Sequence, residues 1–225
     1  MQIWSHRGRV DVAGAAPDNT PQALALVCAH RLDGVEIDTW RTADGQFVVG
    51  HDRDTPAGAV DGLERAAVPE RPGLADVLDA AALGTVNVEL KVPAEAGAEY
   101  AAALGQALGQ WLTARAGGPR VVASSFSRAA TDAVVAAAPH LRVALLCREL
   151  PDPDGLGALG AGGYWGVHPA GARLDAAGVE AIHAAGLAAV AWTVNDAGHA
   201  ARLAGAGLDA VITDMPLALQ QRIGG

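Results

Sequence analysis

The sequence is nearly without lysine: Lys91 is the only one among the 16 basic residues, and all the others are arginines. A composition bias has replaced lysine elsewhere, so we expect Lys91 to occupy a place that an arginine could not fill. Basic charge is scarce altogether, and the formal net charge is -9. That balance argues against broad binding to nucleic acid or anionic membranes, because both reward clustered Lys and Arg. It does not exclude one phosphate in a local basic pocket.

Cysteines and long apolar runs are scarce as well. The two cysteines, Cys28 and Cys147, make neither a disulfide framework nor a metal-binding spacing, and we expect both to be small buried residues. The N-terminus has no basic segment followed by an apolar run, and no later segment of about 18 residues is apolar and free of charge. The sequence therefore predicts a cytoplasmic protein without stable membrane association. It does not indicate an oligomeric state.

Apolar residues are abundant, at 51% of the chain, which is enough for a large core. Short β-branched runs alternate with Ala- and Leu-rich segments of helical length, and this order predicts an α/β fold, the (β/α)8 TIM barrel, with residues 1–225 as a single domain. An open doubly wound sheet stays possible, because strand order cannot be read from one sequence. The expected strands are 2–5, 34–39, 85–91, 120–124, 142–146, 163–167, 187–193 and 210–213, and the expected helices are 21–31, 74–82, 98–116, 128–138, 154–159, 175–185, 197–206 and 215–222.

Two acids share one face of the second expected strand. Side chains alternate along a strand, so Glu36 and Asp38 point to one side and the apolar residues between them to the other. A strand buried on both faces should be almost entirely apolar, and therefore this pair indicates a site. The same stretch continues through a turn and a short apolar run to His51. It thus offers two carboxylates and an imidazole.

The third expected strand has the same character, because Asn87, Glu89 and Lys91 alternate with apolar residues. Polar residues at the carboxyl ends of barrel strands gather on the active face, so Glu89 is expected near Glu36 and Asp38. Two like charges about 4 Å apart cost about 4 kcal/mol at an effective dielectric near 20, and something must offset that repulsion. The candidates are a proton, the nearby cations Arg7 and Lys91, or a divalent cation. Three oxygen ligands suit Mg²⁺ or Ca²⁺ better than Zn²⁺.

Each of these residues also has a plain structural explanation. Glu89 could simply pair with Lys91, and His6 could be a hydrogen-bonded structural histidine at the end of the first strand. Trp192 could belong to the core or to a pocket wall. Taken together these explanations are weak, because all the residues would have to gather at the same end of successive strands by chance. Three further residues stay open. His168 lies at a strand end and could contact substrate, Asn195 is expected to cap a helix rather than act as a ligand, and Asp214 could cap the last helix or touch the site.

At these residues the sequence resembles the glycerophosphodiester phosphodiesterase family, in an ordered set of stretches that spans nearly the whole chain. The resemblance implies a TIM-barrel hydrolase that cleaves a phosphodiester to a phosphomonoester and an alcohol. It also implies one divalent ion, Mg²⁺ or Ca²⁺, held by Glu36, Asp38 and Glu89, with His6 and His51 as catalytic acid and base. Arg7 and Lys91 would bind the phosphoryl oxygens of a small-molecule substrate. We expect Trp192 to contact the substrate as well. The matching stretches are His6-Arg7-Gly8, Pro17-Asp18-Asn19-Thr20, Glu36-Ile37-Asp38, Thr42-Ala43-Asp44-Gly45, His51-Asp52, Glu89-Leu90-Lys91, Ser124-Ser125-Phe126, Trp192-Thr193-Val194-Asn195 and Thr213-Asp214-Met215-Pro216.

Two departures from the family pattern bear on the substrate. Asp18 stands where the family has Glu, which shortens that side chain by one methylene. Only residues 53–72 occupy the place of the family's inserted subdomain after the second strand, so we expect a short insertion. We expect hydrolysis of glycerophosphodiesters to sn-glycerol 3-phosphate and an alcohol. The alternatives are a lipid-directed enzyme similar to phospholipase D and a non-catalytic barrel that binds phosphodiesters.

Overall fold

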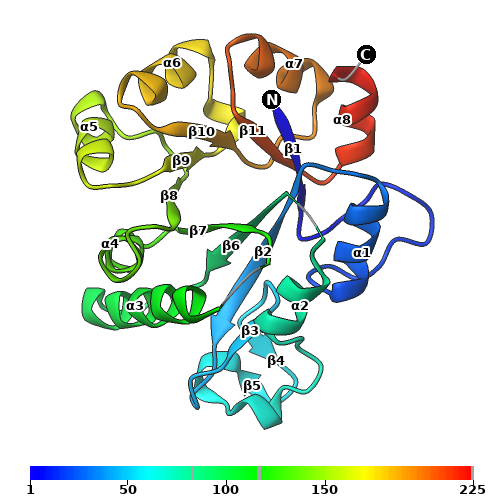
Figure 1. The fold of residues 1–225 in the computed structure, drawn as a ribbon, viewed down its shortest axis with the longest axis vertical. Coiled ribbons are helices and arrows are strands. Elements are labelled where there is room, and N and C mark those ends of the chain that lie inside the picture. Colours follow the sequence, from blue (N-terminus) through cyan, green and yellow to red (C-terminus); the bar gives the residue numbers. More distant parts are fainter. Residues whose placement is uncertain (83, 116–117, 224–225) are drawn as a thin grey trace.

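The computed structural model describes residues 1–82, 84–115 and 118–223. Its parallel strands are β1 (Gln2–His6), β2 (Gly34–Arg41), β6 (Thr85–Leu90), β7 (Arg120–Ser125), β8 (Arg142–Cys147), β9 (Gly166–Pro169), β10 (Ala188–Ala191) and β11 (Ala210–Thr213). These eight described strands follow the order β1-β11-β10-β9-β8-β7-β6-β2, and β1 also pairs with β2 to close the barrel (Figure 1). The predicted TIM barrel is confirmed, and the open sheet is wrong.

Helices surround the barrel and connect successive strands (Figure 1). They are α1 (Pro21–Ala29), α2 (Leu74–Ala80), α3 (Ala98–Ala114), α4 (Arg128–Ala137), α5 (Pro153–Ala161), α6 (Ala176–Ala184), α7 (Ala197–Gly205) and α8 (Pro216–Ile223). Thr20 caps α1 as its hydroxyl accepts from the Ala23 amide, and Pro21 follows in the first turn, as the sequence predicts. Within the described residues, no helix is both long enough and apolar enough to cross a bilayer.

Some expected boundaries differ from the observed ones. The sixth barrel strand begins at Gly166 rather than at Gly163, because Gly163 has a φ of 83° and ends the preceding helix. The following strand ends at Ala191, and Trp192 extends its pairing only as a single parallel bridge to Ala170. The expected end of the third helix, at residue 116, lies outside the described residues. Both cysteines are half-buried free thiols rather than fully buried.

Two layers of core positions hold the barrel. Outward-facing strand residues pack under the helices, as the alternating apolar residues of β2 and β6 predict. A second cluster fills the inside of the barrel, and the indole of Trp4 is its largest member. The interior is therefore packed with side chains, and the polar residues of the strands lie above this apolar cluster, toward the carboxyl ends of the strands. The inner cluster consists of Trp4, Val122, Ala144, Val190, Ala210 and Ile212.

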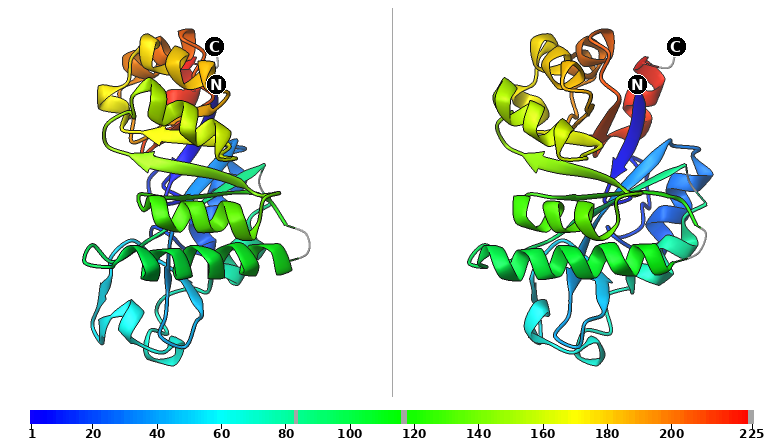
Figure 2. Two further views of the ribbon diagram at one scale, coloured as in Figure 1. Left: turned by 90° about the vertical axis from the view of Figure 1, so that its left-hand side faces the viewer. Right: turned by 60° about the vertical axis from the view of Figure 1, so that its left-hand side comes forward.

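A short insertion separates the second barrel strand from α2. It contains β3 (Phe47–Val49), which pairs antiparallel with β2, then β4 (Asp54–Thr55), β5 (Gly58–Ala59) and the 3-10 turns η1 (Val60–Gly62) and η2 (Arg65–Ala67). Figures 1 and 2 show this cyan segment projecting from the barrel beside the β2 end. Its own small core joins Trp40 and Val48 to Val60 and Val68. The short insertion expected from the sequence is thus present as a compact unit.

Candidate active site

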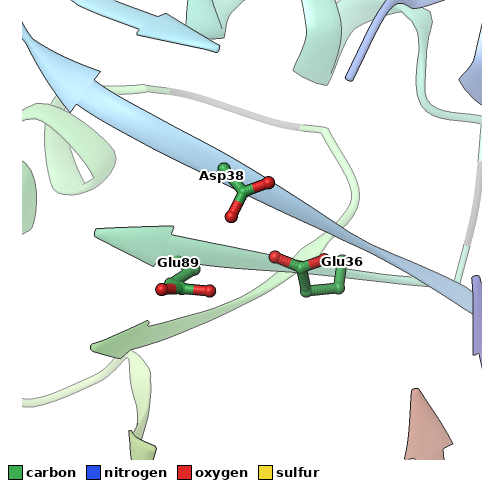
Figure 3. Close-up of side chains that lie close together, drawn as sticks. All are labelled: Glu36, Asp38 and Glu89. Atoms are coloured by element: carbon green, nitrogen blue, oxygen red, sulfur yellow. The ribbon is translucent and has the colours of Figure 1, made fainter. Parts of the chain in front are cut away.

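The three predicted acidic residues lie together inside the barrel mouth (Figure 3). Asp38 of β2 is directly opposite Glu89 of β6 in the sheet register, so their side chains leave neighbouring strands at one level. Glu36 precedes Asp38 by two residues and therefore shares its face. One carboxylate oxygen of each residue lies within 4.8 Å of the others. All three side chains are buried, with relative exposures of 3%, 1% and 8% for Glu36, Asp38 and Glu89.

Lys91 partly neutralises this group. Its ammonium lies 2.7 Å from Asp38 Oδ1 and 2.6 Å from Glu89 Oε1, so one cation bridges two carboxylates. Arg7 Nε lies 3.4 Å from Asp38 Oδ2. Three acids against these two cations leave one formal negative charge. Glu36 Oε1 is buried and has no hydrogen-bond partner within the described chain.

The buried acids have shifted pKa values. Burial raises the pKa of Glu36 well above its ordinary value, and the charges of Asp38 and Glu89 raise it further. Burial also raises the pKa of Glu89, although Lys91 opposes this. Burial would raise the pKa of Asp38 too, but Lys91, Asn19 and Arg7 together bring it below the usual value. The cluster therefore favours added positive charge near Glu36 and Glu89.

Asn19 supports Asp38 from a neighbouring loop. Its amide nitrogen donates to Asp38 Oδ2 over 2.9 Å, and its amide oxygen accepts from the Asp38 backbone N–H over 3.0 Å. The loop itself is held by the backbone N–H of Asn19, which donates to the backbone carbonyl of Arg7 over 2.8 Å. Arg7 and Asn19 have φ values of 57° and 61°, the left-handed region in which non-glycine residues are uncommon. Such strained residues cluster at functional sites.

His6 lies at the end of β1 beside the acids. Its Nδ1 is 2.7 Å from Asp214 Oδ1, and its Nε2 is 3.9 Å from Glu36 Oε2. Burial lowers the pKa of His6 below its ordinary value, although Asp214 counteracts the effect. Asp214 is also bound by Arg9 Nη1 and by Asn195 Nδ2, at 2.7 and 2.9 Å. The ring is therefore held in one orientation with Nε2 toward the carboxylates.

His51 approaches from the insertion. Its side chain is 43% exposed, and its Nδ1 lies 2.8 Å from Asp52 Oδ1. Its backbone carbonyl accepts from the indole of Trp40, which fixes the chain at this point. His51 thus faces the mouth of the site, while His6 lies deeper.

A cavity of about 750 Å³ contains this arrangement. Asp38 is buried behind its wall. Trp192 borders it, with its indole N–H bound to the His168 carbonyl at 2.6 Å. His168 itself is fully buried and does not border the cavity. The other predicted site residues all line it: His6, Arg7, Glu36, His51, Glu89, Lys91 and Trp192.

Sequence reasoning missed the partners of four residues in this region, which are Asp18, Asn19, Asn195 and Asp214. Asp18 does not reach the acids but binds Arg9 Nη2 at 2.7 Å, in a network with Asp214. Asn195 does not cap α7, because Asp196 does so, and Asn195 instead binds Asp214. Asn19 and Asp214 belong to the stretches that match the family, and that match was the one signal in the sequence that pointed to them as site residues. Their partners could not be read from the sequence.

A model of the family described as "Glycerophosphoryl diester phosphodiesterase family" matches residues 6–218, nearly the full length. The chain belongs to this family. The prediction that it is an enzyme of the glycerophosphodiester phosphodiesterase family is thereby confirmed. No curated protein matches the chain.

Solved structures of the family share the barrel. An Oleispira antarctica phosphodiesterase in complex with the product sn-glycerol-3-phosphate is 25% identical, with a TM-score of 0.84 and coverage of 100% of this chain and 97% of that one. A Parabacteroides distasonis glycerophosphodiester phosphodiesterase is 22% identical, with a TM-score of 0.84 and coverage of 99% and 96%. A Thermotoga maritima one is 20% identical, with a TM-score of 0.76 and coverage of 98% and 97%. The similarity to the Parabacteroides distasonis and Thermotoga maritima structures shows the fold alone.

Proposed function

We propose that the chain is a metal-dependent phosphodiesterase that hydrolyses glycerophosphodiesters to sn-glycerol 3-phosphate and an alcohol. The observation that carries this proposal is that His6 and His51 line the same cavity as Glu36 and Glu89, with the buried carboxylate of Asp38 grouped with those two acids. Family membership supports the reaction type. The Oleispira antarctica enzyme, whose structure holds sn-glycerol-3-phosphate, supports the identity of the product. The cytoplasmic location stays a prediction from the sequence.

The residues present fit one divalent ion. Oxygens of Glu36, Asp38 and Glu89 lie within 4.8 Å of one another, and Glu36 Oε1 is buried without a partner in the described chain. An all-oxygen donor set matches Mg²⁺ or Ca²⁺. When bound, such an ion supplies positive charge that polarises a phosphoryl oxygen. Asn19 and Lys91 hold the carboxylates in place for it.

His6 and His51 act as the acid–base pair. In hydrolysis an oxygen nucleophile attacks phosphorus, the bond from phosphorus to the alcohol oxygen breaks, and the leaving alkoxide takes up a proton. One imidazole accepts the proton of the nucleophile and the other protonates the leaving oxygen. Asp214 accepts a hydrogen bond from Nδ1–H of His6, and Nε2 is then directed into the cavity. His51 is placed at the open side of the same cavity.

Arg7 and Lys91 bind the phosphoryl oxygens, and Trp192 forms an apolar wall for the substrate. Negative charge spreads over the phosphoryl oxygens in the transition state, and preorganised cations in a partly dry site stabilise it. Arg7 is held by its backbone as well, since its N–H donates to Glu36 Oε2 over 3.2 Å. Lys91 lies between two metal-ligand candidates and so links phosphoryl binding to the metal position.

The decisive experiment measures turnover of glycerophosphocholine and of an aryl phosphodiester by the purified protein. Each substrate is tested with EDTA and again with Mg²⁺ or Ca²⁺ restored. We expect EDTA to abolish turnover and the metal to restore it. Metal-independent turnover would overturn the ligand assignment, and activity on the aryl ester alone would restrict the proposal to phosphodiester cleavage.

Two other functions remain as outcomes of that experiment. Turnover of a lysophospholipid in preference to glycerophosphocholine would favour the lipid-directed enzyme. Binding without turnover of any ester would favour the non-catalytic barrel. The two imidazoles and two of the acids line one cavity, and Asp38 lies grouped with those acids, which supports catalysis over binding alone.

A further inference from the structure

Arg148 is a cation at the rim of the active-site cavity that none of the proposed catalytic steps uses. It follows the last residue of β8 and therefore lies on the face of the barrel where the strands end. Its side chain is exposed, and no ion pair or side-chain hydrogen bond is formed by it within the described chain. Its guanidinium donors are therefore available to a ligand.

The ring of Phe126 packs against this cation. The Arg148 guanidinium lies 5.4 Å from the centre of the Phe126 ring. Phe126 in turn packs edge-on against Trp192, with ring centres 5.2 Å apart and planes at 89°. A guanidinium stacked on an aromatic face loses little further freedom when it binds an anion. Trp192, a proposed substrate contact, is thus coupled to Arg148 through one ring.

A second hollow of about 390 Å³ extends the active-site cavity on this side. Arg148, Trp192 and Thr193 border both the cavity and the hollow. The other charged residues of the hollow are Glu149 and Arg173, and they pair with each other at 2.6 Å. Across the cavity, Arg53 and Glu95 also pair, at 2.6 Å. Arg148 therefore gives the hollow its uncompensated positive charge.

We propose that Arg148 determines specificity by favouring glycerophosphodiesters whose leaving alcohol carries a second anionic group, a carboxylate or a phosphate. The inference rests on the proposed hydrolysis. With the phosphodiester at Arg7 and Lys91, the alcohol extends past Trp192 into the smaller hollow, where its anionic group binds the Arg148 guanidinium. A cationic alcohol such as choline meets like charge there and is disfavoured.

The test compares kcat/KM for four esters of sn-glycerol 3-phosphate, whose second alcohols are choline, glycerol, glycolate and glycerol phosphate. We expect the wild type to prefer the glycolate and glycerol phosphate esters over the neutral glycerol ester. Arg148→Gln should lower that preference about tenfold, the size expected when a hydrogen-bonded charge is lost. Arg148→Lys should retain part of it, and Arg148→Glu should favour the choline ester.

Arg120→Gln is the matched control. Arg120 is exposed at the start of β7, the opposite end of the barrel, so the same loss of charge should leave the preference unchanged. Equal melting temperatures exclude a folding defect. A response limited to one of the two anionic esters identifies whether a carboxylate or a phosphate is selected. An unchanged preference in Arg148→Gln overturns the inference while hydrolysis stands. Failure of the wild type on all four esters overturns the proposed function and the inference together.

Discussion

Nδ1 of His6 lies 2.7 Å from Oδ1 of Asp214, although 208 positions separate the two residues in the chain. The contact exists because β1 and β11 are neighbours in the closed barrel, with Ser5 opposite Thr213. Burial alone would raise the pKa of Asp214, but hydrogen bonds from Asn195, His6 and Arg9 lower it to about 2. Asp214 is therefore charged near neutral pH and keeps the His6 ring oriented.

Asp214→Asn should reduce kcat by up to about 100-fold, the lower end of the contribution of an acid–base group. The neutral amide no longer favours an Nδ1 proton on His6, so the ring loses its fixed tautomer and part of its basicity. The pH profile of kcat should shift, which a purely structural role would not cause. Asp209→Asn is the control. Asp209 Oδ2 lies 2.9 Å from His183 Nε2, and this pair does not border the cavity. Equal effects of both changes would contradict the role of Asp214.

His51→Ala should lose hydrolysis by about 100-fold or more and keep metal binding. His51 contacts Asp52 rather than the carboxylate cluster, so its removal leaves the ligand oxygens in place. Turnover assays and calorimetric titration with Mg²⁺ or Ca²⁺ measure the two properties separately. Normal turnover in this variant would remove His51 from the mechanism.

Asn19→Gly should weaken metal binding by about tenfold, the lower range for loss of a group that orients a ligand. Glycine accepts the positive φ of 61° at this position, so the change removes the amide without straining the backbone. Asp38 then loses the donor to its Oδ2 and is free to turn. Calorimetry gives the affinity. Asn19→Ala is the companion variant, and it should be less stable than Asn19→Gly because alanine disfavours this φ.

Lys91→Met should lower the free energy of unfolding by about 3 kcal/mol, because loss of one partner leaves buried charges without compensation. Its ammonium lies within 2.7 Å of both Asp38 and Glu89. A divalent cation bound at the same carboxylates should restore part of the lost free energy of unfolding. Urea titrations with and without Mg²⁺ or Ca²⁺ therefore test whether Lys91 and the metal contact the same carboxylates. A deficit that the metal leaves unchanged would contradict it.

His168→Gln should make stability less sensitive to acid. Burial lowers the pKa of His168 from 6.5 to about 3. Between these values the unfolded chain binds a proton that the folded protein does not, so stability falls as the pH is lowered through this window, by about 1.4 kcal/mol per pH unit. The variant lacks this titrating group. Its free energy of unfolding, measured by urea titrations between pH 6.5 and 4.5, should therefore fall less steeply with decreasing pH than that of the wild type. Parallel curves would show that His168 does not titrate differently on folding.

Local sequence determined much of the fold and part of the site. Strand and helix positions follow from hydrophobic periodicity, and eight repeats of strand and helix favour a barrel. The pairing of β1 with β2 in the folded structure then decided against an open sheet. The alternation in β2 and β6 was enough to place Glu36, Asp38 and Glu89 on inward faces, because side chains in a strand change sides at every residue. Where glycine conformation overrode the apolar pattern, as at Gly163, the predicted boundary was wrong.

The contacts between distant segments were decided by the tertiary structure. Periodicity describes one element at a time, and the pairing of His6 with Asp214 depends on the closure of the barrel between the first and last strands. The same holds for Asn19 beside Asp38, which requires a left-handed turn in a loop. The sequence by itself determined which side chains face inward, since that depends on local geometry. Only the folded barrel decided which of them meet, because strand register and loop conformation are set by packing across the whole chain.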